Sequence, residues 1–324
     1  MLTEVSFASI RRSPLSKATL AALLMAGALV QTGCSTHHTS LQSDDTQSHS
    51  DVFDKSWLHV VKGNMPLVIS APHGGMIKPD NIADRECGTQ ERDDNTDHLA
   101  LEIEKAFETY GQKPYLVIAK ISRAKIDLNR DLETATCGNQ KMAYTWHQYH
   151  QDIEAALDDA ISQFGYAMYI DLHGQSHKVR RLELGYSLRS PALKANYEAT
   201  VTPQTVEKTS VENILQHSND LSLKTLLTGE YAFGTLMAEA GFPSVPSQQD
   251  PYPLADQRYF TGGYNTRRYT SSDYPNVFGM QIESNFFGVR NSQQNQTQFS
   301  EAFAKVINDY LQYINQHVDW KNTQ

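Results

Sequence analysis

The apolar residues of three stretches recur at the spacing of an amphipathic helix. In residues 146–164, 299–314 and 99–107 they fall three or four positions apart, which places them on one face of a helix. Gly165 directly follows the first of these stretches, and Asn95 precedes the last as a candidate N-cap. The pattern therefore predicts three helices whose apolar faces pack on a common core.

Shorter apolar runs lie between these helices and indicate β-strands. They are residues 67–71, 115–121, 167–172, 182–188 and 280–283. Residues 192–220 are polar and weakly patterned, which favours an inserted helix and loop, and residues 229–241 favour a short helix. Strands that alternate with helices predict an α/β fold, a three-layer sandwich with a mostly parallel central sheet.

The first 34 residues have the composition of an export signal. Basic residues precede an apolar run at 18–30, which is shorter than the roughly 20 residues of a membrane-spanning helix. Small residues before Cys34 resemble a bacterial lipobox, although Gln31 stands where that motif has a leucine-like residue. We expect export to the bacterial envelope and a lipid anchor on Cys34 in the outer membrane, facing the periplasm or the surface. A plain signal peptide that is cut nearby is the alternative.

Residues 35–54 are rich in Ser, Thr, His, Gln and Asp and predict a flexible linker. We expect residues 55–320 to form a single α/β domain. Hydrophobic residues make up 40% of the chain and charged residues 20%, which supports a substantial core. A formal net charge of −9, with no basic stripe, argues against nucleic acid as a partner.

Cys87 and Cys137 remain after removal of the signal segment. Two cysteines in an oxidising compartment favour one disulfide, and neither stands beside a histidine as a nucleophile would. The bond would close a loop of about 50 residues and stabilise the fold by about 2–4 kcal/mol.

Two of the predicted strands end in a histidine that is followed by glycine. The run Leu-Val-Ile-Ser-Ala is followed by Pro72 and His73, and Asp-Leu leads into His173 and Gly174. In open α/β sheets, ligands bind at the carboxyl ends of the strands. A lone histidine is more often an ordinary hydrogen-bonded residue, but the pair indicates a metal site at the rim of the sheet.

Residues 122–131 follow a predicted strand and are dense in hydrogen-bonding side chains. Arginine suits bidentate recognition of a carboxylate, and a neighbouring asparagine can add a hydrogen bond. A network of Asp and Arg side chains that fixes the loop is an equal alternative for this stretch alone.

Four motifs in order give the sequence a specific resemblance. They read Ser-Ala-Pro-His-Gly-Gly, Ser-Arg followed by Asp-Leu-Asn-Arg, Asp-Leu-His-Gly, and Gln-Ile-Glu. Over roughly residues 65–310 this set resembles the N-formylglutamate amidohydrolase family and, more distantly, the zinc carboxypeptidases and the succinylglutamate desuccinylase group. The resemblance implies a zinc carboxypeptidase-like fold with one zinc ion over the carboxyl ends of the central strands.

The resemblance implies that His73 and His173 are zinc ligands. A catalytic zinc takes three protein ligands, but Met76 occupies the position where the carboxypeptidases place a glutamate. We expect Asp93 to be the third ligand, because it precedes a helix N-terminus, where a carboxylate is favoured. Capping of that helix is the other role open to Asp93.

Three acidic residues remain alternatives for the third ligand: Asp94, Asp97 and Glu86. Asp171 stands two residues before His173 and is the nearest candidate to orient its ring, since both side chains lie on the same face of a strand.

By the same resemblance, Glu283 matches the late-strand glutamate that acts as general base and acid in the carboxypeptidases. A strand glutamate paired with Arg290 is the alternative. Asn129 and Arg130 match the pair that binds a substrate carboxylate, and Arg123 is a candidate to stabilise the oxyanion.

Residues 264–268 follow two glycines and look like a mobile, polar substrate loop that includes Arg267. Arg267 is therefore the next candidate for the carboxylate anchor. His177 and Glu183 are candidates to line the pocket.

These features predict a zinc amidohydrolase that acts on a small acidic N-acyl amino acid or a short peptide. One alternative is an envelope peptidase of the zinc carboxypeptidase type. The other is a surface-anchored binding lipoprotein that has lost the chemistry, although the joint presence of His73, His173 and Glu283 argues against it.

Overall fold

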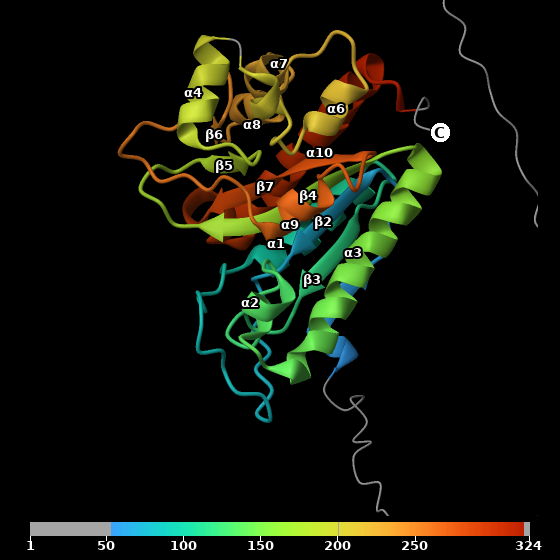
Figure 1. Cartoon of the computed structure of the whole chain (residues 1–324), viewed down its shortest axis with the longest axis vertical. Coiled ribbons are helices and arrows are strands. Elements are labelled where there is room, and N and C mark those ends of the chain that lie inside the picture. The colour runs from blue at the N-terminus through green and yellow to red at the C-terminus, as the bar shows by residue number, and fades with distance from the viewer. Residues whose placement is uncertain (1–52, 200, 321–324) are drawn as a thin grey trace, which may run out of the picture. The chain divides into compact units, whose positions relative to one another are not determined.

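The centre of the protein is a mixed sheet, seen in a computed structural model that describes residues 53–199 and 201–320 (Figure 1). Its strands lie in the order β1 (Leu58–Val61), β3 (Tyr115–Ala119), β2 (Leu67–Ala71), β4 (Ala167–Gln175), β7 (Val277–Asn285), β5 (Leu182–Gly185) and β6 (Ser244–Val245). The four strands β3, β2, β4 and β7 run parallel. β1 is antiparallel to β3, and β5 is antiparallel to β7.

Helices cover both faces of this sheet (Figure 1). α3 (Ala143–Phe164) packs its apolar residues on one face. The opposite face is covered by α1 (Thr96–Glu108), α8 (Phe233–Glu239) and α10 (Gln293–His317). The predicted α/β fold with helices on both faces of a mostly parallel sheet is therefore confirmed.

Shorter helices fill the connections between these elements. They are α2 (Leu132–Thr136), α4 (Ser190–Glu198), α5 (Pro203–Val206), α6 (Glu212–Gln216), α7 (Leu223–Thr228) and α9 (Tyr264–Tyr269). The 3-10 turns η2 (Lys55–Trp57) and η3 (Gln140–Met142) and the irregular turn η4 (Phe286–Arg290) complete the set for the described residues.

The alternation of side chains along the central strands decides which face carries the polar residues. In β4, Ile170 and Leu172 belong to the core beneath α1 and α10, whereas Tyr169 belongs to the core beneath α3. Asp171 and His173 continue the Tyr169 face. The polar residues thus lie at the carboxyl end of the sheet, beyond the apolar contacts of α3.

One local prediction is wrong, and another holds for the position of the residue but not for its hydrogen bond. Residues 264–268 are not a loop, because they form α9, where Asn265 and Thr266 are buried and the Asn265 N–H donates to Asn129 Oδ1 at 2.9 Å. Asn95 stands at the N-cap of α1, but its side chain makes no cap bond and donates instead to the Arg290 carbonyl at 2.9 Å.

The predicted signal segment 1–34, with Cys34, lies outside the described residues, as does the predicted linker up to residue 52. The described chain falls within one compact unit, Ser48–Gln324. None of the helices within residues 53–320 has the length and apolarity that crossing a bilayer requires.

Candidate metal centre and active site

Three side chains from three separate segments meet at the carboxyl edge of the sheet. His73 follows β2, His173 lies in β4, and Asp93 lies just before α1. The Nδ1 atoms of the two histidines are 3.2 Å apart. Asp93 Oδ2 is 3.0 Å from His173 Nδ1 and 3.5 Å from His73 Nδ1. Within the described chain these side chains form a group arranged to hold a metal ion.

The spacing of the donor atoms fits a small tetrahedral metal. With metal–ligand bonds of about 2.0–2.1 Å, tetrahedral donors lie roughly 3.3 Å apart. The three separations of 3.0, 3.2 and 3.5 Å fall around this value. Two imidazole nitrogens and one carboxylate oxygen also form a donor set that suits a borderline-soft divalent cation.

Each imidazole is oriented from behind by a carboxylate. His73 Nε2 donates to Asp127 Oδ1 at 2.7 Å, and His173 Nε2 donates to Asp171 Oδ2 at 2.9 Å. In a neutral imidazole that donates through Nε2, the Nδ1 lone pair is free for a cation, and both Nδ1 atoms face the common centre. A pair of ordinary buried histidines would not need two carboxylates arranged in this way.

The Asp93 side chain points to the centre and does not cap α1. Its Oδ2 accepts from the Gly174 N–H at 3.2 Å, while Thr96 donates to the Asp93 backbone carbonyl. Burial opposes ionisation of Asp93, but the hydrogen bonds from His173 and His73 prevail and hold its pKa well below the usual range.

The other acidic candidates for the third ligand point elsewhere. Asp97 is buried against Lys120, whose Nζ donates to it at 2.7 Å. Asp94 pairs with Arg92 at 2.6 Å, and Glu86 is exposed. The structure thus brings together His73, His173 and Asp93 and leaves the alternatives outside the centre.

His173 carries a pKa that reflects its polar surroundings. Burial alone would lower the pKa, but the charge and hydrogen bond of Asp171, the hydrogen bond to Asp93 and the charge of Glu283 raise it well above the ordinary value. A raised pKa means that His173 is protonated on both ring nitrogens when no metal is bound. Binding of a cation at Nδ1 would replace the proton on that nitrogen, since metal ligands must be deprotonated.

Glu283 lies beside His173 on the neighbouring strand. The two residues are register partners across β4 and β7, so their side chains emerge on the same face of the sheet. Burial raises the pKa of Glu283 to about 8, and the charges of Asp93 and Glu183 add to this effect while His173 opposes it. Gln281 Nε2 donates to Glu283 Oε1 at 2.8 Å.

Arg290 is not the hydrogen-bond partner of Glu283 that the alternative interpretation expected. Its Nε donates to the Ser284 carbonyl at 3.1 Å, and its Nη2 donates to the Gln175 carbonyl at 3.0 Å. A third bond goes to the Asp94 carbonyl. Arg290 therefore fixes backbone around the centre, and its effect on Glu283 is limited to a nearby charge that lowers the pKa of that group.

A cavity of about 300 Å³ opens over these groups. Its lining includes His73, Asp93, His173 and Glu283, together with Arg123, Asn129, Arg130, Arg267, Gln281 and Phe260. All eight residues predicted for metal binding, catalysis or substrate binding thus reach one cavity.

The arginines around this cavity are engaged to different degrees. Arg123 is buried, and its Nε and Nη2 donate to Asp127 Oδ2 at 3.1 and 3.0 Å, so most of its guanidinium supports the candidate metal centre. Arg130 Nη1 donates one hydrogen bond to the Asn129 carbonyl at 2.7 Å. Arg267 is exposed and donates to the Gly262 carbonyl at 2.9 Å. Arg130 and Arg267 are therefore the cations with donors left for a bound anion.

Asn129 is packed into the cavity wall. Its Oδ1 accepts from the Asn265 N–H, and its Nδ2 lies 3.1 Å from His173 Nε2. A methyl group at Gly263 would overlap this amide, so the close approach of α9 depends on that glycine. The predicted substrate contact of Asn129 thus competes with a role in holding the wall.

A second polar cluster supports the other wall. Glu183 is buried and is the register partner of Glu283 across β5 and β7. It accepts from His177 Nδ1 at 2.7 Å and from the Phe260 N–H at 2.9 Å. The His177 and Phe260 rings stack with centroids 5.1 Å apart. His177 and Glu183 are thus not among the residues that line the cavity, where the sequence placed them as candidates, but they hold Phe260, which does line it.

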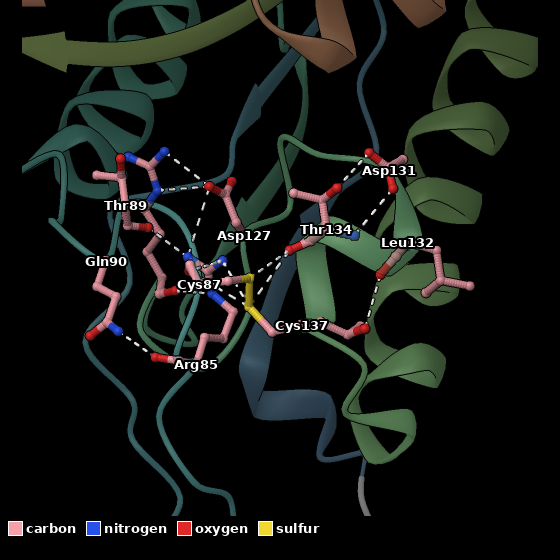
Figure 2. The surroundings of a disulfide bond; sticks show 11 residues. Arg85, Cys87, Thr89, Gln90, Asp127, Asp131, Leu132, Thr134 and Cys137 are labelled. Atoms are coloured by element: carbon pink, nitrogen blue, oxygen red, sulfur yellow. Dashed lines mark hydrogen bonds and ion pairs between the residues drawn. A yellow bond between two sulfur atoms is a disulfide. The ribbon is translucent and has the colours of Figure 1, made fainter.

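Cys87 and Cys137 are joined in a disulfide, with Cα atoms 6.0 Å apart (Figure 2). The bond connects the loop before Asp93 to the end of α2. It lies beside Arg85 and Asp127, which the sequence interpretation left without a role.

The residues that the sequence interpretation missed support the ligands. Asp127 stood inside the polar stretch 122–131 and was part of the Asp-Leu-Asn-Arg motif, which was the available signal. Arg85 and Phe260 gave no signal of this kind, because their contacts depend on how loops fold back on the sheet. Gln281 was part of the Gln-Ile-Glu motif, where its alternation with Glu283 was the available signal.

Comparison with known proteins agrees with this site. The family model described as N-formylglutamate amidohydrolase matches residues 65–143, which include His73, Asp93 and the stretch 122–131. The predicted resemblance to this family is confirmed, and the match supports an amidohydrolase. No curated protein sequence matches the chain significantly.

One solved structure shares the fold, and others resemble the chain more weakly. The N-formylglutamate amidohydrolase from Ralstonia eutropha JMP134 is 13% identical with a TM-score of 0.50, over 80% of this chain and 98% of that one. A gene product of Agrobacterium tumefaciens is 10% identical, with a TM-score of 0.47 over 82% and 99% of the two chains. The succinylglutamate desuccinylase from Chromobacterium violaceum is 12% identical, with a TM-score of 0.35 over 79% and 63%.

Proposed function

We propose that the protein is a zinc-dependent hydrolase that cleaves the amide bond of an N-acyl amino acid resembling N-formylglutamate. The observation that carries this proposal is the meeting of His73, Asp93 and His173 at donor separations of 3.0–3.5 Å beside Glu283. The family match over residues 65–143 supports the amide as the bond that is cleaved.

In the proposed reaction, three residues hold the zinc ion and Glu283 transfers the proton. A zinc ion held by the three ligands would lower the pKa of a water molecule and polarise the scissile carbonyl. Glu283 takes a proton from the attacking water as the carbon–oxygen bond forms. The carboxyl group then gives this proton to the departing nitrogen as the carbon–nitrogen bond breaks, which leaves a carboxylic acid and an amine, and the acid loses its remaining proton to the amine or to solvent.

Recognition of an acidic substrate rests on the two cations that retain free donors. Arg130 projects into the cavity and is the proposed anchor for a substrate carboxylate. Arg267 stands at the exposed rim and suits a second anionic group. The small volume of about 300 Å³ favours a substrate of one or two amino acids.

We further propose that the enzyme works in the cell envelope, lipid-anchored through Cys34. The basic and apolar leader supports export. The Cys87–Cys137 disulfide supports an oxidising compartment, because such bonds are rare in the cytosol. Mass analysis of the mature amino terminus tests the anchor, and an unmodified terminus downstream of Cys34 would contradict it.

The test of function is a screen with the purified full-length chain. N-formyl-glutamate, other N-acyl amino acids and short peptides are each offered to the zinc-loaded and the chelated protein. We expect zinc-dependent hydrolysis of an acidic N-acyl amino acid, and a higher KM for it in Arg130→Met. A substrate that lacks the carboxylate should be poor for the wild type and insensitive to this substitution.

Other outcomes of the screen identify the alternatives. Hydrolysis of peptides with little turnover of N-acyl amino acids would assign the protein to the peptidases. A chain that binds zinc and acidic ligands but turns over none of them is a binding protein, and the proposed function is then wrong.

A further inference from the structure

Arg85 links the disulfide region to the metal centre. Its side chain is buried, with 2% of its surface exposed, although it lies in a loop. Figure 2 shows its guanidinium between the disulfide and the Asp127 carboxylate. A buried arginine is costly unless all its donors are matched, so its contacts indicate what it holds in place.

The donors of Arg85 close the loop that leads to Asp93. Nη1 donates to the Cys87 carbonyl at 3.1 Å, and Nη2 donates to the Thr89 carbonyl at 2.6 Å. Gln90 Nε2 donates back to the Arg85 carbonyl. The loop is therefore wrapped around one guanidinium, and the metal ligand Asp93 follows Thr89 by four residues.

The same side chain holds the turn that carries Asp127. Arg85 Nε donates to the Arg123 carbonyl at 3.0 Å, and the Arg85 backbone N–H donates to the Ala124 carbonyl at 2.6 Å. Nη2 lies 3.9 Å from Asp127 Oδ2. The other carboxylate oxygen of Asp127, Oδ1, accepts from Nε2 of the ligand His73. Arg85 thus contacts the supports of two metal ligands at once.

The disulfide fastens this arrangement from the outside. Cys87 lies in the wrapped loop and Cys137 lies at the end of α2, and Arg85 Nη1 is 3.8 Å from Cys137 Sγ. Without the bond, the loop would keep only hydrogen bonds to hold Arg85 under Asp127.

We propose that Arg85 is a positioning residue for the metal centre, and that the Cys87–Cys137 disulfide holds it there. This inference rests on the proposed metal-dependent function but concerns metal affinity, which is measured without substrate. Removal of groups that orient metal ligands lowers affinity by roughly 10–100-fold.

The test compares zinc affinity in two variants with that of a matched control. Arg85→Met removes the guanidinium group while keeping most of the side-chain length. The double variant Cys87→Ser/Cys137→Ser keeps Arg85 but removes the covalent bond that holds the loop. Arg181→Met is the control, because Arg181 is equally buried and paired with Asp250 at 2.6 Å, outside the lining of the metal cavity. Zinc dissociation constants come from competition with a chromophoric chelator, and the visible spectrum of Co²⁺ reports ligand geometry.

We expect both test variants to bind zinc roughly 10-fold or more weakly, with an altered Co²⁺ spectrum, and the control to bind as the wild type does. Arg85→Lys, which keeps the charge but not the guanidinium group, provides the same readout if Arg85→Met does not fold, and it should not restore the affinity. Wild-type affinity and spectrum in a folded Arg85 variant would overturn the proposal, as would an equal loss of affinity in Arg181→Met. Tight zinc binding without hydrolysis of any substrate would refute the proposed function and leave this inference standing.

Discussion

Each imidazole of the candidate metal centre is paired with its own carboxylate, and this pairing should have a measurable effect. Asp171→Asn keeps the shape of the side chain but leaves His173 Nε2 without a charged acceptor. We predict a roughly 10–100-fold loss of zinc affinity with little change in fold. Chelator competition measures it, with Asp250→Asn as a control outside the cavity lining. Equal affinities for wild type and Asp171→Asn would refute the orienting role.

Glu283 is the residue whose loss should separate chemistry from binding. Glu283→Gln keeps the size of the side chain and removes the proton acceptor. We predict a fall in kcat of roughly 10²–10⁴-fold, with KM and zinc content nearly unchanged. Steady-state kinetics on the best substrate, with metal analysis of the same sample, provides the measurement. Hydrolysis at the wild-type rate with zinc bound would remove Glu283 from the mechanism.

Residues that end a strand could be placed from the sequence, whereas residues that support them could not. His73 and His173 follow apolar runs, and the edge where parallel strands end is fixed by topology, so their meeting was predictable. Arg85 lies in an irregular loop, and its partners are backbone carbonyls that no sequence pattern marks.

Among the elements, the long helices showed their period in the sequence and α9 did not, although the short helix favoured over residues 229–241 is present as α8. The stretch 146–164 has enough turns to show its period, and α3 ends at Phe164, where Gly165 adopts a φ of 85°. α9 has six residues and a polar composition, so its helical form depends on tertiary contacts, including the bond from its Asn265 N–H to Asn129.

The packing of α3 on α9 creates a pH-dependent term in stability. His150 is buried against Trp146, and its Nδ1 lies 2.6 Å from the Tyr269 hydroxyl. Burial lowers the pKa of His150 to about 3, with smaller contributions from Arg268 and His147. Since the unfolded state has the higher pKa, it binds the proton more readily, and the stabilising contribution is full above about pH 6.5.

We therefore predict that the free energy of unfolding declines by up to about 1.4 kcal/mol per pH unit through His150, from about pH 6.5 downward. His150→Phe keeps an aromatic ring and should lose this part of the pH dependence. Urea unfolding of both proteins at about pH 7, 6 and 5 gives the comparison. Parallel pH profiles for the two proteins would show that His150 does not contribute.

At the scale of the whole molecule, the sheet order brings together candidate metal ligands that are far apart in sequence. His73 and His173 are separated by 100 residues, yet β2 and β4 are neighbours. Alternating strands and helices predicted a parallel sheet, but the edge strands β1 and β6 are short or partly exposed, and no pattern distinguished them. The sequence thus supported the fold class and the edge that carries the site, and the order of strands required tertiary structure.

The disulfide should also contribute to overall stability. It joins residues 50 positions apart, and closing a loop of this length restricts the unfolded chain. Cys87→Ser/Cys137→Ser should lower the free energy of unfolding by about 2–4 kcal/mol. Urea denaturation of the metal-free proteins isolates this effect from zinc binding. An unchanged midpoint and slope would show that the bond does not stabilise the fold.

The central claim is that His73, Asp93 and His173 hold one zinc ion, and the zinc content of the full-length chain tests it most directly. After zinc repletion and removal of excess metal, the wild type should contain one zinc per chain. The double variant His73→Ala/His173→Ala should contain far less than one, while remaining folded by circular dichroism. Zinc well below one per chain in the wild type, or an equal content in the double variant, would contradict the account.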